Sequence, residues 1–201
     1  MIALALLMLA ADPETAVEAE RAFAQAAQTE GQWTAFRRYS TPDAVIFTPQ
    51  PKKAHEALPQ KNPPTAIEWW LAESYVACDG SVAVNTGPWK LPQSQGFFTT
   101  IWVRQADGRH KWIYDGGSEL ATPRPLPAAP KVQRVACAGA PVFRLQVPPD
   151  RSWVSDGGSS KDGTLAWTWQ VAADGSRSLD VYLWNGQNFE PVIQDRVGAP
   201  K

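Results

Sequence analysis

One acidic side chain closes an otherwise apolar and aromatic stretch of the sequence. The stretch "GFFTTIWVRQADGRHKWIYDGG" covers residues 96–117, and the acid at its end is Asp115. If the fold buries this carboxyl among apolar groups, its pKa rises towards working pH, and it becomes a candidate base or hydrogen-bond donor. The alternative is structural: Asp115 hydrogen-bonds Thr99 or Thr100, or caps a turn near the two glycines that follow it. A single acid without an identified partner favours the structural role.

The other chemistry-bearing residues form no catalytic or metal-binding motif. His55 lies beside Lys52 and Lys53 and is expected to be solvated, and His110 lies next to a turn and is expected to be exposed. Two histidines without a suitably spaced acid do not predict a zinc or non-haem iron site. The sequence has no glycine-rich phosphate loop, no G-x-S-x-G motif and no Cys–His pair in a catalytic context. We therefore expect no metal and no cofactor.

The two cysteines, Cys78 and Cys137, lie in different segments of the chain. In an oxidising compartment they would pair, and the bridge would hold the C-terminal segment on the first domain. The other interpretation is two buried thiols, because free cysteine is often buried as a small hydrophobic residue. Their spacing fits no zinc site.

The first eleven residues, MIALALLMLAA, resemble the apolar region of a secretory signal. The run is far too short to span a bilayer, and a buried first helical turn is the alternative. We interpret residues 1–11 as a signal peptide and expect a periplasmic or secreted protein without a membrane span.

Composition and charge narrow the class of protein. The 201-residue chain is 44% hydrophobic and 19% charged, which is enough apolar material for a core and too little charge for disorder. Its net charge is −1, and its 19 basic and 20 acidic residues are scattered without a run. Such a chain has no electrostatic field that would concentrate nucleic acid, so nucleic acid is excluded as a partner.

Two helices are expected at the start of the chain. Asp12 before Pro13 predicts a helix start, and apolar residues then recur at helical spacing as far as Ala27. Gly31 ends this helix, and a second apolar stripe follows over residues 33–39.

Strands are expected after these helices. A short strand covers 44–48, and residues 67–70 form either a helical turn or an extended entry. Asp79-Gly80 and Asp107-Gly108 each join two stretches of period-two pattern into a hairpin. Helices followed by antiparallel strands are typical of the α+β class, with the helices on one face of the sheet.

A linker with four prolines, residues 121–130, precedes a β-rich C-terminal region. Five short strands are predicted there: VQRVACA, VFRLQV, TLAWTWQV, LDVYLW and FEPVI. The glycines around Ser159-Ser160 are interpreted as a loop. A region of this size buries only about 60% of its chain surface alone, so we expect it to pack on the first domain.

The register of the hairpin at 96–117 is open. A two-residue turn pairs Trp102 with Ile113, and a three-residue loop with a bulge pairs Trp102 with Trp112. Under either register, strand alternation puts Ile113 and Asp115 on one face. Trp112 and Tyr114 then lie on the other face. Both faces are apolar and must be covered, one by the helices and the other by the C-terminal strands or a second protomer.

Three stretches together resemble the NTF2-like superfamily, in its SnoaL-like or DUF4440 type. They are "AERAFAQAAQTEGQWTAFRRYSTPDAVIFTP" (19–49), "WWLAESYVACDGSVAVNTGPWK" (69–90) and the hairpin at 96–117. The resemblance covers roughly residues 14–120. It implies a cystatin-like cone, a curved antiparallel sheet wrapped on N-terminal helices with one open end. The chain would then divide into an NTF2-like domain (12–120), the Pro-rich linker (121–130) and a small all-β C-terminal extension (131–201).

The resemblance also implies a pocket inside the cone. Its lining would be Phe36 and Tyr39 from the helix, Phe47 from the first strand, Trp69 nearby, and Trp102 with Asp115 from the sheet. Isomerases of this superfamily use a carboxylate base together with a hydrogen-bonding group that steadies an enolate oxygen. By resemblance, Asp115 would be the base or the protonated donor, and Tyr39 the phenolic partner.

Three functions fit these expectations. The leading one is an exported, non-catalytic protein that binds a small, largely apolar molecule in its cone. The second is a cofactor-independent isomerase, dehydratase or hydrolase that uses Asp115 and Tyr39. The third is an interaction protein that forms a homodimer through the outer face of the sheet.

Overall fold

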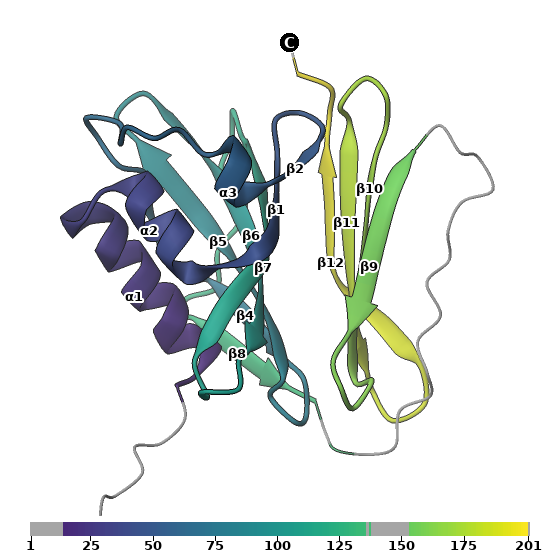
Figure 1. Ribbon diagram of the computed structural model, residues 1–201. Coiled ribbons are helices and arrows are strands. Elements are labelled where there is room, and N and C mark those ends of the chain that lie inside the picture. The colour runs from purple at the N-terminus through teal and green to yellow at the C-terminus, as the bar shows by residue number, and fades with distance from the viewer. Residues whose placement is uncertain (1–13, 136, 138–152, 201) are drawn as a thin grey trace, which may run out of the picture.

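The computed structural model describes residues 14–135, residue 137 and residues 153–200. The apolar run at 1–11, the predicted helix start at Asp12 and the predicted strand VFRLQV (142–147) lie outside the described residues. The described part consists of a group of helices and two β-sheets (Figure 1).

The helices are α1 (Ala16–Thr29), α2 (Gln32–Tyr39) and the short α3 (Ala54–Ala57). A capping box starts α1: the Thr15 hydroxyl accepts from the Glu18 amide, and the Glu18 carboxylate accepts from the Thr15 amide. Gly31 separates α1 from α2 with a φ of 101°, a conformation that favours glycine. The predicted pair of helices is confirmed.

The first sheet is mixed. Its strands are β1 (Ser40–Phe47), β2 (Pro51–Lys53), β3 (Glu68–Trp69), β4 (Glu73–Val76), β5 (Val82–Leu91), β6 (Ser94–Arg104), β7 (His110–Glu119) and β8 (Lys131–Arg134). They lie in the order β2-β1-β7-β6-β5-β4-β8, with β3 beside β5. The expected antiparallel hairpins β4–β5 and β6–β7 are present. Two pairs, β1–β7 and β4–β8, are parallel, so the expectation of a purely antiparallel sheet is wrong.

The second sheet is antiparallel, with the order β12-β11-β10-β9. Its strands are β9 (Val154–Ser159), β10 (Leu165–Val171), β11 (Arg177–Trp184) and β12 (Phe189–Val197). The last three were predicted from the sequence. The segment before Ser160, interpreted as a loop, forms β9 instead. The predicted strand VQRVACA forms β8, which extends the first sheet, so the C-terminal unit expected from residue 131 is divided between the two sheets.

The chain forms three layers, with the helices on one face of the first sheet and the second sheet on its other face (Figure 1). Phe23, Trp102 and Trp112 are buried between the helices and the sheet. Ile101 and Tyr114 are buried on the opposite face, against apolar side chains of β10, β11 and β12. The C-terminal strands therefore cover the second apolar face, which leaves that face unavailable for the expected homodimer. The class, α+β, is confirmed.

A β-bulge at Ile113 changes the faces that simple alternation predicted. Near the turn Trp102 pairs with Trp112, as in the three-residue loop, whereas beyond the bulge Ile101 pairs with Tyr114. Trp112 consequently faces the helices and Tyr114 faces the second sheet. The prediction that these two share a face is wrong, because an inserted residue shifts the alternation by one position. Asp115 lies on the helix-facing side, and Ile113 packs on the other side.

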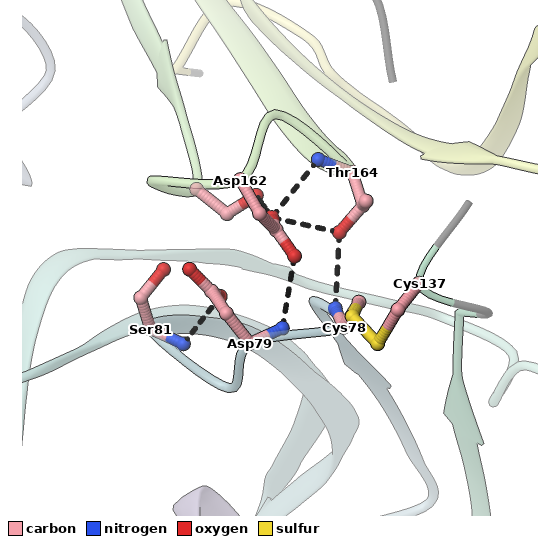
Figure 2. Close-up of a disulfide and its surroundings, with 7 residues drawn as sticks. Cys78, Asp79, Ser81, Cys137, Asp162 and Thr164 are labelled. Carbon is pink, nitrogen blue, oxygen red and sulfur yellow. Dashed lines mark hydrogen bonds between the residues drawn. A yellow bond between two sulfur atoms is a disulfide. The ribbon is translucent and has the colours of Figure 1, made fainter. Parts of the chain in front are cut away.

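Side-chain hydrogen bonds join the turn between β9 and β10 to the turn between β4 and β5 (Figure 2). The Asp162 carboxylate accepts from the Asp79 amide at 2.9 Å and from the hydroxyl of Thr164, which itself accepts from the Cys78 amide at 3.0 Å. Cys78 is bonded to Cys137 with their Cα atoms 5.1 Å apart. The disulfide links the chain beyond β4 to the chain beyond β8, close to the point where the two sheets meet.

Arg124 of the proline-rich linker contacts residues of both sheets. Arg124 forms an ion pair with buried Asp195 of β12, with nitrogen and oxygen 2.8 Å apart but without the geometry of a hydrogen bond. The same guanidinium lies 3.4 Å from the centre of the Phe97 ring. Asp195 also accepts a hydrogen bond from the Thr99 hydroxyl of β6 at 2.7 Å. The linker therefore holds the second sheet against the first.

We expect Asp162→Ala to lower the free energy of unfolding by about 1 to 3 kcal/mol, because it leaves several donors at the joint between the sheets without an acceptor. The matched control is Asp174→Ala, since Asp174 accepts from Ser176 alone in an exposed turn between β10 and β11. Chemical denaturation followed by tryptophan fluorescence measures both variants. Equal effects of the two substitutions would contradict a joint at Asp162.

Candidate functional site

A cavity of about 490 Å³ lies between the helices and the helix-facing side of the first sheet. Its wall is mainly aromatic and aliphatic, with contributions from α1, α2, β1, β5, β6 and the chain that follows α3. The aromatic members are Phe23, Trp33, Phe36, Phe47, Trp69, Trp89, Phe97 and Phe98. Its polar members include Thr100 of β6, Asp115 of β7 and Arg177 of the second sheet.

The cavity reaches the position where β1 and β7 separate. The last register pair between these strands is Val45 with Tyr114. The residues that follow in each strand, 46–48 and 115–118, line the cavity. The Asp115 side chain projects from the helix-facing side of β7 beside Thr100, which places its carboxyl in the wall.

Asp115 is half-buried, with its exposed part facing the cavity. Burial, and then the charge of nearby Glu20, raise its pKa well above the usual range. Among the described residues it has no hydrogen-bond partner, so the structural role expected for it, a bond to Thr99 or Thr100, is not observed. The hydroxyl of Thr100, its cross-strand neighbour, is buried and also unpaired.

Glu20 of α1 is fully buried beside this site. It accepts hydrogen bonds from the indole nitrogens of Trp69 at 2.8 Å and Trp102 at 2.7 Å, and from the Asn85 amide at 3.2 Å. Burial raises its pKa to about 6, and the three hydrogen bonds act in the opposite direction. Asn85, Thr100 and Asp115 are successive cross-strand neighbours on β5, β6 and β7. A polar row therefore crosses an otherwise apolar wall, with Glu20 behind it.

In this arrangement the Glu20 carboxylate is occupied by three hydrogen bonds, whereas the Asp115 carboxyl faces the cavity. The three donors around Glu20 stabilise its charged form, and a charge on Glu20 disfavours a second charge on Asp115. A protonated Asp115 can donate a hydrogen bond to a ligand oxygen, and a deprotonated one can accept a proton. The site thus has the elements of hydrogen-bonded ligand recognition and of proton transfer.

The structure brings together most of the residues that the sequence proposed for the pocket. Phe36, Phe47, Trp69 and Asp115 line the cavity, whereas Trp102 and Tyr39 do not. Trp102 is fully buried behind the wall, where it holds Glu20.

Tyr39 packs on the far side of the aromatic cluster. Its ring centre lies 5.3 Å from that of Phe23, and the cations of Arg38 and Lys111 lie 5.3 Å and 5.9 Å from it. The phenol is therefore not placed with Asp115 at one cavity, as the resemblance implied.

Glu20 and Arg177 are polar groups of the site that were not predicted from the sequence. Glu20 had a signal, because it lies four residues after Ala16 and three before Phe23, on the apolar face of α1. Thr100 was considered only as a structural partner of Asp115, and its place in the cavity wall follows from the register of β6 and β7. Arg177 had no signal, since it begins an ordinary strand of a different sheet.

The prediction that His110 is exposed is wrong. His110 is buried, and its Nδ1 atom has no partner in the described part of the chain. Burial, and then the charge of Arg104, lower its pKa. His55 is exposed as expected, and its Nε2 atom lies 2.8 Å from the Ser40 hydroxyl.

Within residues 14–135, 137 and 153–200, no three His, Cys, Asp or Glu side chains gather closely enough to hold a metal ion. The same part of the chain has no helix whose length and hydrophobicity would let it cross a membrane.

No family model, no curated protein and no solved structure matches this chain significantly. The function has to be inferred from the cavity itself.

Glu20 predicts a pH dependence of stability. Its pKa is about 6 in the folded chain, and its ordinary value, which applies to the unfolded chain, is 4.5. Between these two pH values the native state therefore keeps a proton that the unfolded state has lost. The free energy of unfolding therefore falls by roughly 2 kcal/mol as pH rises through this window. Asp115, whose pKa is also raised, contributes with the same sign. The comparison is therefore made in an Asp115→Asn background.

In that background we expect Glu20→Gln to remove this slope and to be destabilising, because an amide cannot accept from all three donors. Denaturation curves at a series of pH values measure the effect, with exposed Glu56→Gln as the control. A slope that survives Glu20→Gln would show that Glu20 does not titrate in this window.

Proposed function

We propose that this protein binds a small, largely apolar molecule whose polar group meets Asp115 and Thr100 inside the cavity. The observation that carries the proposal is a carboxyl, without a hydrogen-bond partner among the described residues, in the wall of an aromatic cavity of about 490 Å³. This volume lies within the range of about 300 to 1,000 Å³ typical of small-molecule sites, which combine apolar walls with a few convergent polar groups.

The unpaired polar groups favour binding over a purely structural role. A buried hydroxyl or carboxyl without a partner costs about 1 to 3 kcal/mol, and the Thr100 hydroxyl and the Asn85 carbonyl oxygen are both in this state. A ligand hydroxyl or carbonyl at Asp115 and Thr100 would offset part of this cost.

The NTF2-like cone remains our proposal for the fold family. Its support is the α+β order, with the helices on one face of the sheet and a cavity between helices and sheet. Export to the periplasm or the outside of the cell is likewise proposed. The disulfide between Cys78 and Cys137 supports it, because such bridges persist in oxidising compartments.

The second candidate function is proton transfer, as in a cofactor-independent isomerase. The observation that favours it is the raised pKa of Asp115, which brings a carboxyl closer to the strength of a general base at neutral pH. Since Tyr39 does not line the cavity, Thr100 is the better candidate for the group that steadies a developing oxyanion.

Binding is tested by titrating small aromatic ketones and alcohols while following the fluorescence of the cavity tryptophans. We expect Thr100→Val to weaken binding roughly tenfold, because it removes one hydrogen bond and keeps the side-chain shape. Thr168→Val, on a β10 threonine outside the cavity, is the matched control. Equal affinities in the two variants would remove Thr100 from the site, and no binding by the wild type would contradict the function.

Proton transfer is distinguished by deuterium exchange at the carbon next to the carbonyl of a bound ketone. Catalysis predicts exchange that the wild type accelerates and Asp115→Asn abolishes, because the amide cannot accept the proton. Asp156→Asn on β9 is the control. A ketone that binds but exchanges at the uncatalysed rate would leave binding alone as the function.

A further inference from the structure

Among the described residues of the cavity wall, Arg177 is the one cationic side chain, and it comes from outside the helix-and-sheet unit that forms the rest of the wall. It is the first residue of β11, in the second sheet. Its Nη2 atom donates to the carbonyl oxygen of Gly117 at 2.5 Å, and its guanidinium carbon lies 5.4 Å from the centre of the Phe47 ring. These two contacts hold the side chain where β1 and β7 separate.

The charge of Arg177 is not balanced within the described part of the protein. No carboxylate there lies within ion-pair distance of it, and the neighbouring acids of β11 and β12 are engaged elsewhere. Asp180 pairs with Arg196 at 2.6 Å, and Asp195 pairs with Arg124 at 2.8 Å. A backbone carbonyl satisfies one of the five N–H donors of a guanidinium and neutralises no charge.

Burial makes this unpaired cation unfavourable. Arg177 is half-buried, and desolvation lowers its pKa, with Tyr114 as the opposing influence. Burial raises the pKa of Tyr114 far above its usual value, so the phenol stays neutral and supplies no counter-charge. A partly desolvated cation that faces an apolar cavity is stabilised most by an anion that enters that cavity.

We propose that the cavity takes an apolar carboxylic acid, with the carboxylate bound by Arg177 and the hydrocarbon body among the aromatic side chains. This inference rests on the proposed binding function and names its ligand class. A carboxylate matches the planar fork of a guanidinium with two parallel hydrogen bonds. Its single charge also balances the single cation of the wall, whereas a phosphate brings up to two charges.

Asp115 is compatible with an acidic ligand. Because its pKa is raised by burial and by Glu20, it is more readily neutral than an ordinary aspartate and repels an anion less. Both groups line the cavity, and among the described residues no ion pair joins them, so each can make its own contact with a ligand. The Arg177 position therefore selects charge, and the Asp115–Thr100 position is left for a second polar group of the ligand.

The test uses a homologous series of ω-phenylalkanoic acids, each with its matched primary alcohol, and follows tryptophan fluorescence of the full-length protein. For the best-fitting pair we expect the wild type to prefer the acid roughly ten- to hundredfold, the effect of a charge-assisted hydrogen-bonded pair. Arg177→Gln should lose the preference while binding the alcohol as before, which shows that the cavity is intact. Arg177→Lys should keep part of the preference for the acid, because it retains the positive charge.

Arg196→Gln is the matched control, because Arg196 is an exposed arginine of the second sheet that pairs with Asp180 outside the cavity. It should keep the full preference for the acid. Equal binding of acid and alcohol by the wild type would overturn the role of Arg177 and leave the binding function standing. A preference that survives in Arg177→Gln would also overturn it, and failure of the whole series to bind would contradict the binding function itself.

Discussion

The architecture depends on one constraint: the first sheet is apolar on both faces. Trp102 faces the helices and its neighbour Ile101 faces away from them, and both are fully buried. A sheet of this kind is stable only when both faces are covered, because exposed aromatic side chains favour association. The helices cover one face and the second sheet covers the other. The disulfide, the Asp162 joint and the Arg124–Asp195 ion pair all lie around the contact that this constraint requires.

The same contact shapes the cavity. Beyond the last pair of β1 and β7, the cavity wall is completed by Arg177, which belongs to the second sheet. The second sheet thus covers the first sheet and also supplies Arg177, the one cationic side chain among the described residues of the cavity wall. Asp115 in the wall and Glu20 behind it add two acids whose pKa values are raised by burial. Groups of this kind reduce stability, and this cost is the physical basis of the proposed ligand.

Local signals predicted the elements well, and non-local relations limited the prediction of the site. The turn at Asp107-Gly108 correctly predicted the hairpin of β6 and β7. Both candidate registers are present in this hairpin, one between the turn and the bulge at Ile113 and the other beyond the bulge. No pattern in the sequence predicted the bulge, so Trp112 and Tyr114 were assigned wrongly to one face. Strand β9 was missed because its glycines resemble those of a loop, and β8 was assigned to the wrong unit because its parallel partner is distant in sequence. Asp115 was found, but its charged neighbours were not.

If the two sheets form one cooperative unit, native-state hydrogen exchange should show it. We expect the slowest amides of β6 and β7 to exchange with the same free energy of opening, to within about 1 kcal/mol, as those of β10 and β11. Both sets should respond equally to denaturant, because the sheets separate only when the chain unfolds. Amides of the second sheet that exchange through a much smaller opening, while those of β6 and β7 stay protected, would show that the two sheets unfold separately.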